Sequence, residues 1–361
     1  MRRASLLTIA VIAGYLLLWP VAIEPLAWRA PADAGLTGIF AENRHLSELE
    51  TIILKDTHGP EALAIKDSVI YASTREGWIV RYNENTGQTD QWVNTQGSPL
   101  GMVFDSDNNL IVADAYRGLL AISPSGQITV LTDHINGQPI AFADDLDIAE
   151  DGKIYFSDAS SKFGAMAYGG PHGASMLDII EHGGHGRLLM FDPQTNTTAV
   201  VMSGLNFANG VAIDSQSQFV LVNETGSYRI HKYWLRGPKA GSSELLIENL
   251  PGFPDNIVRG SNGHFWVGLV SPRIPVIDKL SSYPTVRKII QRLPAFTRPD
   301  GTAYSHVFAI DQHGNVLTSL QDPEGQYPTT TGAIESEHWL YISSLDAPNL
   351  ARISRDSASI P

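Results

Sequence analysis

The repeating pattern of this chain is clearest in Asn209–Tyr233, which reads NGVAIDSQSQFVLVNETGSYRIHKY. A polar first residue and a glycine lead into a short apolar run, and a Ser/Gln-rich turn separates this run from Phe219–Val222. A second turn at Gly226 precedes another apolar stretch that ends at Tyr233. Apolar runs of this length between turn residues are typical of β-strands. The segment therefore predicts three strands of one small antiparallel sheet.

The same unit recurs along the chain, so repeats must be considered before any fold is chosen. The other copies begin at Pro60-Glu61, Pro99-Leu100, Asp144-Asp145 and Asp255-Asn256, and a weaker last copy contains Trp339–Ile342 and Leu350–Ile353. Six copies, spaced by roughly 40–65 residues, predict an all-β, six-bladed β-propeller over residues 49–361. The last copy lacks one strand, which Leu49–Leu54 can supply to close the ring. A β-sandwich or a pair of β-domains is the less favoured alternative.

Composition excludes several classes of protein. The net charge is −13, and Lys and Arg cluster only in the first three residues, so a nucleic-acid-binding surface is not expected. The chain has no cysteine, which excludes disulfides, thiolate metal sites and cysteine nucleophiles. The 32 glycines and 21 prolines supply the many turns that a protein of short strands needs.

The N-terminus predicts a membrane anchor. Arg2 and Arg3 precede an apolar run from Ala4 to Ile23, interrupted only by Pro20 and long enough for a transmembrane helix. The charges place residues 1–23 as a cytoplasmic tip and signal anchor, residues 24–48 as a linker, and the propeller on the non-cytoplasmic side. A cleaved signal peptide, with Ala32-Asp33-Ala34 as its cleavage site, is the alternative.

The first residues of the repeats predict a metal site. The first strand of each propeller blade lines the central channel, so residues just before it point into the channel mouth. Glu61, Asp144, Asn209 and Asp255 hold such positions, with Asn256 beside the last, and all carry side-chain oxygens. Calcium binds six to eight oxygen ligands, and carboxylates without a cation would repel one another. The alternative is that these are ordinary turn residues bonded to their own backbone.

The chain also resembles a known family. The carrying segments are Gly59–Ala62, Pro99–Gly101, Val112–Leu119, Asp144–Leu146, Ile154–Phe163, Gly186–Leu189 and Pro251–Ile257. Together they are similar to the strictosidine-synthase-like and adipocyte plasma-membrane-associated proteins, within the group of paraoxonases and senescence-marker-protein/gluconolactonases. The resemblance extends from about Gly59 to Ile353 and includes the N-terminal anchor.

This resemblance implies a six-bladed propeller that binds Ca²⁺ through Glu61, Asp144, Asn209 and Asp255. Relatives usually carry Asn at the position of Asp144, and the extra charge is expected to tighten cation binding and to weaken the cation's Lewis acidity. Asp145 is then either a support for the ligands or a general base, and Asn256 is a further ligand.

Two departures from the family restrict the chemistry. The paraoxonase histidine dyad falls on Leu100 and Ala115, and the glutamate of strictosidine synthase falls on Thr331. A condensation of an amine with an aldehyde is therefore not expected. The sequence instead predicts a calcium-dependent hydrolase of a small-molecule ester or lactone, with Asp145 or Asp255 as the base. The alternative is a non-enzymatic binding module with structural calcium. The oligomeric state is left open.

Two insertions interrupt the repeats. Gly164–Gly186 contains His172, His182 and His185 and predicts a solvent-exposed lid loop with a short amphipathic helix over Ser175–Glu181. Val276–Leu293 predicts a surface helix, with a membrane-facing role as the alternative.

Overall fold

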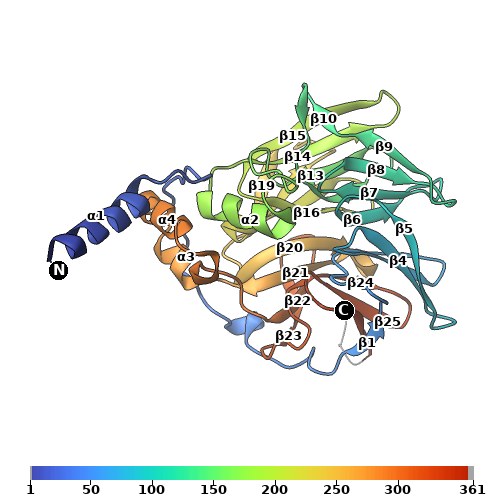
Figure 1. Cartoon of the computed structure of the whole chain (residues 1–361). Helices are drawn as coiled ribbons and strands as arrows, with labels where there is room; N and C mark the ends of the chain where they lie inside the picture. The colour runs from blue at the N-terminus through green and yellow to red at the C-terminus, as the bar shows by residue number, and fades with distance from the viewer. Residues whose placement is uncertain (1, 357–361) are drawn as a thin grey trace.

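The computed structural model describes residues 2–356, which form six four-stranded antiparallel sheets around a central axis (Figure 1). The predicted six-bladed β-propeller is confirmed. In each blade the strands are given from the inner strand outward. Blade 1 consists of β2 (Leu63–Lys66), β3 (Val69–Ser73), β4 (Trp78–Asn83) and β5 (Thr89–Asn94), and blade 2 consists of β6 (Pro99–Phe104), β7 (Leu110–Asp114), β8 (Gly118–Ile122) and β9 (Ile128–Thr132). Blade 3 consists of β12 (Ala143–Ile148), β13 (Ile154–Asp158), β14 (Gly186–Asp192) and β15 (Thr197–Leu205).

The second half of the ring repeats this order. Blade 4 consists of β16 (Ala208–Ile213), β17 (Phe219–Glu224), β18 (Arg229–Trp234) and β19 (Ser243–Ile247), and blade 5 consists of β20 (Gly252–Arg259), β21 (Phe265–Pro272), β22 (Ser305–Ile310) and β23 (Val316–Asp322). Blade 6 consists of β24 (Thr330–Glu335), β25 (Trp339–Ser344), β26 (Asn349–Ser354) and β1 (Glu50–Ile53). A small hairpin of β10 (His134–Ile135) and β11 (Gln138–Pro139) lies between blades 2 and 3.

The ring is closed by strands from both ends of the chain. The N-terminal strand β1 pairs antiparallel with β26, from Glu50 opposite Arg352 to Ile53 opposite Asn349. The sequence predicted this closure, because the last repeat was one strand short. Leu54, directly after β1, is fully buried with residues of blades 1 and 6.

The core consists of apolar layers between successive blades. Leu110 and Val112 pack toward Ile79 of blade 1, whereas Ile111 packs toward Phe156 of blade 3. Both faces of β7 are therefore buried, and its sequence is a continuous apolar run rather than an alternating one. This double burial explains why the strands read as short uninterrupted runs.

The insertions lie at the end of the propeller where the inner strands begin. Each inner strand runs away from this end and its second strand returns, so loops after the second strand return there too. The loop after β13 holds α2 (Gly170–Glu181), and the loop after β21 holds α3 (Pro275–Lys279), α4 (Pro284–Gln291) and a 3-10 turn over Ala295–Thr297 (Figure 1). The single helix predicted over Val276–Leu293 is wrong, because Ser281–Tyr283 turns the chain and Pro284 starts a second helix.

The N-terminal helix α1 (Arg2–Leu18) projects from the propeller beside α4 (Figure 1). It ends two residues before Pro20, because proline disfavours helical backbone at the preceding residue. In the part of the chain that the structure describes, no helix is long and apolar enough to cross a membrane. The transmembrane helix expected from the apolar run is therefore not found.

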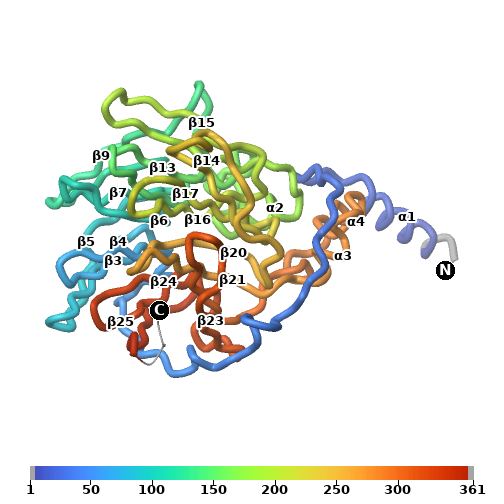
Figure 2. Tube along the Cα trace, turned by 180° about the vertical axis from the view of Figure 1, so that it is seen from behind, coloured from blue at the N-terminus to red at the C-terminus, as the bar shows by residue number. Residues whose placement is uncertain are grey.

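The segment from residue 19 to residue 48, of which residues 24–48 were expected to be a linker, runs across the insertions toward blade 6 (Figure 2). Its backbone bonds to the propeller at several points. Leu26 N donates to Glu181 O (3.0 Å), Trp28 N donates to Ser281 O (3.1 Å), and Leu46 N donates to Gln321 O (2.9 Å). We call this segment the strap.

Candidate functional site

The structure brings the predicted ligands together at the start of the inner strands. Glu61, Asp144, Asn209, Asp255 and Asn256 are all at least 95% buried, and we call these five residues the mouth ring. Glu61 lies two residues before β2, the inner strand of blade 1, and the other four lie within inner strands of blades 3 to 5.

Four of the mouth-ring residues lie in irregular pairings of their inner strands. The register shifts between Ala143 and Leu146 in β12, between Ala208 and Val211 in β16, and between Pro254 and Ile257 in β20. Such β-bulges turn side chains away from the regular alternation and recur beside functional sites. Here the irregular positions hold the mouth-ring residues of blades 3 to 5.

The bulged layer leaves no room for side chains at its glycines. A Cβ on Gly210 would lie 2.4 Å from the carbonyl oxygen of Asp255, and one on Gly101 would lie 2.2 Å from Asp145 Oδ1. Neighbouring inner strands approach this closely only because glycine has no Cβ. These glycines set the spacing at which the polar side chains of the mouth ring meet.

Hydrogen bonds use both amide nitrogens of the mouth ring but leave three of its side-chain oxygens without a partner. Asn256 Nδ2 donates to Glu61 Oε1 (2.9 Å) and to the Glu61 carbonyl (3.0 Å), and Asn209 Nδ2 donates to Asp255 Oδ1. Thr331 Oγ1 also donates to the Glu61 carbonyl (2.6 Å). Glu61 Oε2, Asn209 Oδ1 and Asn256 Oδ1 are buried without a hydrogen-bond partner. Buried unpaired oxygens are costly unless something positive satisfies them.

The carboxyl groups of the mouth ring disfavour one another's charge. Burial raises the pKa of Glu61 far above its ordinary value, and the charges of Asp255 and Asp144 raise it further. Burial, followed by the charges of Asp255 and Asp145, also raises the pKa of Asp144. Burial raises the pKa of Asp255 to about 7, although the bond from Asn209 opposes this rise. Their ionised forms are therefore costly unless a positive charge neutralises them.

Asp145 and Asp147 tie blade 3 to the backbone of blade 4. Asp145 accepts hydrogen bonds from Val211 N (2.8 Å) and Leu146 N (2.9 Å), and Asp147 accepts one from Ile213 N (2.8 Å). Burial raises the pKa of Asp145 to about 8, although these backbone donors lower it. Asp145, the predicted general base, thus also has a structural role.

The channel widens beyond the mouth ring into a cavity of about 280 Å³. Asp145 and Asn256 line it, together with apolar residues further along the inner strands, such as Met102 and Ile257. The cavity therefore lies on the far side of the mouth ring from α2, α3 and α4.

Sequence reasoning missed a second set of buried acids at the ends of second strands. Asp114 accepts from Ser98 N (2.9 Å), Asp158 from Phe142 N (3.2 Å), and Glu224 from Asn206 N (3.0 Å). Each carboxylate holds the backbone just before the inner strand of its own blade. Their shared position at the end of β7, β13 and β17 was the available signal.

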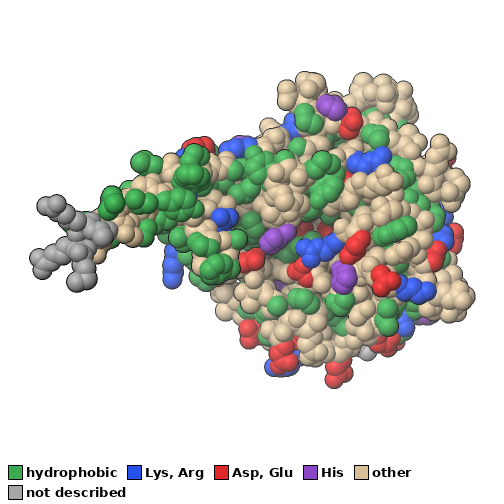
Figure 3. Space-filling model, viewed as in Figure 1, with side chains coloured by type: hydrophobic (Ala, Val, Ile, Leu, Met, Phe, Trp, Pro, Cys, Tyr) green, Lys and Arg blue, Asp and Glu red, His purple; other side chains and the backbone are tan. Residues whose placement is uncertain are grey.

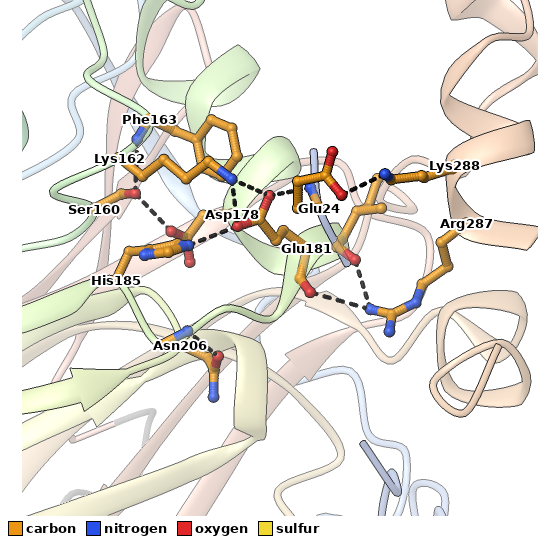
Figure 4. A network of polar contacts seen from close by, with 12 residues as sticks. Glu24, Ser160, Lys162, Phe163, Asp178, Glu181, His185, Asn206, Arg287 and Lys288 are labelled. Atoms are coloured by element: carbon orange, nitrogen blue, oxygen red, sulfur yellow. Dashed lines mark hydrogen bonds and ion pairs between the residues drawn. The ribbon is translucent and has the colours of Figure 1, made fainter. Parts of the chain in front are cut away.

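Helix α2 is held by a network of polar contacts (Figure 4). Ser160 Oγ donates to Asp178 Oδ2 (2.6 Å), Lys162 Nζ donates to Glu181 Oε2 (2.6 Å), and His185 Nε2 bonds Glu181 Oε1 (2.6 Å). The strap joins the network, since Glu24 N donates to Glu181 Oε2 (2.6 Å) and Glu24 pairs with Lys288. These contacts fix the insertion to the strap.

The predicted exposed histidine loop is only partly correct. His172 is exposed, but His182 is buried and its ring stacks on Trp28 of the strap at 3.8 Å and 6°. Burial accordingly lowers the pKa of His182 to about 3. The predicted helix over Ser175–Glu181 also begins earlier, at Gly170.

Within residues 2–356, no group of three or more acidic or histidine side chains is arranged to hold a metal ion. The chemistry of the mouth ring nevertheless fits a hard cation. Its donors are carboxylate and amide oxygens, three of these oxygens are unpaired, and the amide nitrogens already point to protein acceptors. Neither thiolates nor histidines contribute to the mouth ring, which disfavours a softer metal.

Fold and site together define a six-bladed propeller with an acidic, oxygen-rich channel mouth. The strictosidine synthase family profile matches residues 144–238, and the strictosidine synthase-like N-terminal profile matches residues 38–82. The bovine adipocyte plasma membrane-associated protein is 33% identical over 97% of this chain and 89% of its own length. Strictosidine synthase-like 13 of Arabidopsis thaliana is 38% identical over 72% of this chain and 64% of its own length. The chain belongs to this family of strictosidine synthase-like and adipocyte plasma membrane-associated proteins.

Solved structures share the fold at low identity. A gluconolactonase of Xanthomonas campestris superposes with a TM-score of 0.62 at 18% identity, over 85% of this chain and 88% of that one. The calcium-binding protein regucalcin of Agrobacterium tumefaciens superposes with a TM-score of 0.59 at 12% identity, over 84% and 93%. These likenesses establish the architecture alone.

Proposed function

We propose that this protein is a calcium-dependent hydrolase of small lactones or esters. The observation that carries the proposal is the mouth ring, where buried carboxylates meet three unpaired oxygens without a neutralising side chain. The gluconolactonase and the calcium-binding regucalcin with the same fold support both parts of the proposal.

The residues divide into ligands and a base. Glu61, Asp144, Asn209 and Asp255 would hold the cation, with Asn256 as a further ligand. Calcium bound there would polarise a carbonyl and stabilise the negative charge that develops on its oxygen. Asp145 lines the channel cavity and is the carboxylate that would accept the proton of the attacking water. Asp255, the other predicted base, is better placed as a ligand, because Asn209 orients its carboxylate.

A binding module with structural calcium is the second candidate. It is favoured by Asp145, whose two oxygens each accept a backbone hydrogen bond and so already have a structural function. A strictosidine-synthase-type condensation has no support at Thr331, whose hydroxyl bonds the Glu61 carbonyl and Ser343. Leu100 and Ala115 lie in an apolar cluster and offer no substitute for a histidine dyad.

We further propose that the protein associates with a membrane through α1. The relatives named adipocyte plasma membrane-associated protein support this location. Apolar side chains on α1, among them Leu7, Val11 and Leu18, are more than 60% exposed (Figure 3). Arg292 fixes the helix to the insertion through Trp19 O (2.6 Å) and Leu16 O (3.0 Å). The non-cytoplasmic side remains a prediction from the charges of Arg2 and Arg3.

The function is tested by hydrolysis of a panel of aryl esters and lactones, with and without calcium. We expect chelation, Asn209→Ala and Asp255→Ala each to reduce kcat/KM by about 100-fold or more, because each removes charge stabilisation in the transition state. Asn315→Ala, at an exposed turn, is the matched control and should match the wild type. If nothing is hydrolysed while chelation lowers the melting temperature, calcium is structural and the binding module is the correct function.

A further inference from the structure

Helix α4 places its side chains in the opposite way to an ordinary surface helix. Arg287, within the helix, and Arg292, directly after it, are both buried. Val286 is exposed, and Tyr283, the residue before the helix, is 58% exposed. A surface helix in water turns its apolar side chains toward the core and its charges outward. The outer face of α4 therefore suits an apolar environment better than it suits water.

Exposed apolar side chains continue beyond both ends of α4. Near its N-terminal end lies Leu26 of the strap, an exposed residue whose carbonyl accepts a hydrogen bond from Arg287. Beyond its C-terminal end, Phe296 of the 3-10 turn over Ala295–Thr297 is 89% exposed, more than any other large hydrophobic side chain in the described part of the chain. Single exposed apolar residues are ordinary, but a series of them along one element indicates an interaction surface.

Helix α1 is fixed to this surface at the C-terminal end of α4. Arg292 Nε donates to Trp19 O (2.6 Å), and Tyr15 Oη donates to Arg292 O (2.9 Å). Hydrophobic side chains gather over α1 and beside its junction with the insertion (Figure 3). Whatever environment receives the apolar side chains of α1 therefore also lies close to the outer face of α4.

The loop that carries α3 and α4 differs in charge from the rest of the chain. Residues 273–304 contain six Lys and Arg but only two Asp, whereas the whole chain has a net charge of −13. These cations are spread along the loop, so they form no run in the sequence, and Lys279 among them is exposed. Exposed aromatic and aliphatic side chains beside cations are complementary to a bilayer that contains anionic lipids.

We propose that the outer face of α4 and the 3-10 turn after it dock on a lipid bilayer with anionic headgroups. This inference extends the proposed membrane association through α1 and is independent of the hydrolase proposal. Phe296 and Tyr283 then lie at the boundary between headgroups and acyl chains, and Lys279 lies at the headgroups. Because the insertions are at the end of the propeller where the inner strands begin, this contact turns the channel mouth toward the membrane.

Fluorescent labels test the contact in the full chain. The chain has no cysteine, so single-cysteine variants can each carry one environment-sensitive fluorophore. We expect the label on Phe296→Cys to brighten and shift to shorter wavelength when phosphatidylcholine vesicles with about one third phosphatidylglycerol are added. Val130→Cys, at an exposed apolar residue of the outer strand β9, is the matched control and should not respond. If the protein sediments with the vesicles while the label on Phe296→Cys does not respond, the inference is overturned.

A label on Leu7→Cys separates this inference from the proposed role of α1. A response at Leu7→Cys alone would mean that α1 holds the protein on the membrane without α4, and the inference would be wrong. A response at Phe296→Cys alone would support the inference and contradict the proposal for α1. A response at Phe296→Cys that appears without vesicles and grows with protein concentration would show that a second copy covers this face, which also overturns the inference.

Affinity measurements test the apolar and the charged part of the surface separately. Phe296→Ser should weaken partition into the anionic vesicles about tenfold, because it removes the burial of a large apolar side chain, and Val130→Ser should leave partition unchanged. Lys279→Gln should weaken binding to the anionic vesicles about fivefold and leave binding to pure phosphatidylcholine vesicles unchanged. Wild-type affinity in both Phe296→Ser and Lys279→Gln would contradict the inference.

Discussion

Glu181 illustrates how a single residue couples the folded state to pH. It lies at the end of α2 with its side chain 3% exposed, in contact with Lys162, His185 and the backbone of Glu24 (Figure 4). Burial alone would raise the pKa of Glu181, but the hydrogen bonds from His185 and Lys162 outweigh it and lower this pKa to about 2. The carboxylate therefore stabilises the fold only while it is ionised.

The lowered pKa of Glu181 predicts an acid-sensitive fold. Its contribution is fully present above the ordinary glutamate pKa of about 4.5 and is lost as pH falls from there toward about 2. Glu181→Gln should lower the free energy of unfolding at pH 7 by about 1–3 kcal/mol, since hydrogen bonds to a charged group contribute about that much. The same variant should lose less stability than wild type between pH 4.5 and 2. Urea unfolding at several pH values measures both effects.

Glu337→Gln is the control for this prediction, because the Glu337 side chain is 88% exposed and its ion pair is long (3.9 Å). Parallel pH profiles for the wild type and Glu181→Gln would show that the Glu181 network does not stabilise the fold.

At the scale of elements, Arg287 joins three segments that are distant in the sequence. This buried residue of α4 donates to Ile180 O of α2 (2.6 Å), to Ser281 O (3.0 Å) and to Leu26 O of the strap. The guanidinium group has enough donors in one plane to bond several carbonyls at once. The strap, α2 and α4 therefore form one unit beside the mouth ring.

Removal of this guanidinium should loosen the unit without unfolding the blades. Arg287→Met keeps an apolar stem but removes the donor of the Ile180 and Leu26 carbonyls, whereas Ser281 O keeps its bond from Trp28 N. A buried carbonyl left unsatisfied costs about 1–3 kcal/mol. We expect faster hydrogen exchange in residues 24–32 and 170–182, with exchange in β7 and β17 unchanged. Arg236→Met, which removes an exposed ion pair with Glu150, is the control and should change neither region. Equal exchange in Arg287→Met and wild type would contradict this role.

At the scale of the whole molecule, the ring depends on β1. This strand comes from the start of the propeller sequence but completes the last blade, so closure joins residues about 300 positions apart. Leu54 is 1% exposed, and Ile52 packs against the same cluster between blades 6 and 1. Such a closure stabilises every blade, because each blade buries its faces only against its neighbours.

Two truncated proteins test this closure. A variant that lacks residues 1–48 keeps β1, and one that lacks residues 1–54 loses it. We expect the second to melt roughly 6–10 °C below the first, because burial of Ile52 and Leu54 contributes about 1.5–3 kcal/mol each. Thermal unfolding followed by circular dichroism measures the difference. Identical melting temperatures would mean that β1 does not hold the ring closed.

Much of the architecture could be predicted because it follows from short stretches of the sequence. The six apolar repeats and the missing strand in the last one predicted the blades and their closure. The oxygen-bearing first residues, Glu61, Asp144, Asn209 and Asp255, were found because they recur at one position of the repeat. Residues at the same position of different repeats lie at the same end of the channel. Glu61 and Asp255 therefore meet at the channel mouth although they are 194 positions apart in the sequence.

Two features followed from local proline signals: Pro20 ended α1 early, and Pro284 started a second helix after the turn at Ser281–Tyr283. The burial of His182 by Trp28 of the strap instead depended on a long-range contact that no local pattern encodes. The strap had the composition of a linker, yet the backbone donors of the strap and the guanidinium of Arg287 bind it across the insertions.

The sequence by itself determined the propeller, its six repeats and the residues that meet at its mouth, because short apolar runs and a recurring polar residue at the start of the repeats are properties of the chain. Only the tertiary structure decided which oxygens remain unpaired, on which side of the mouth ring the cavity lies, and how the strap is held. Those features arise from packing between blades and insertions, where Gly210, Phe142 and Arg287 each act through neighbours that are distant in sequence.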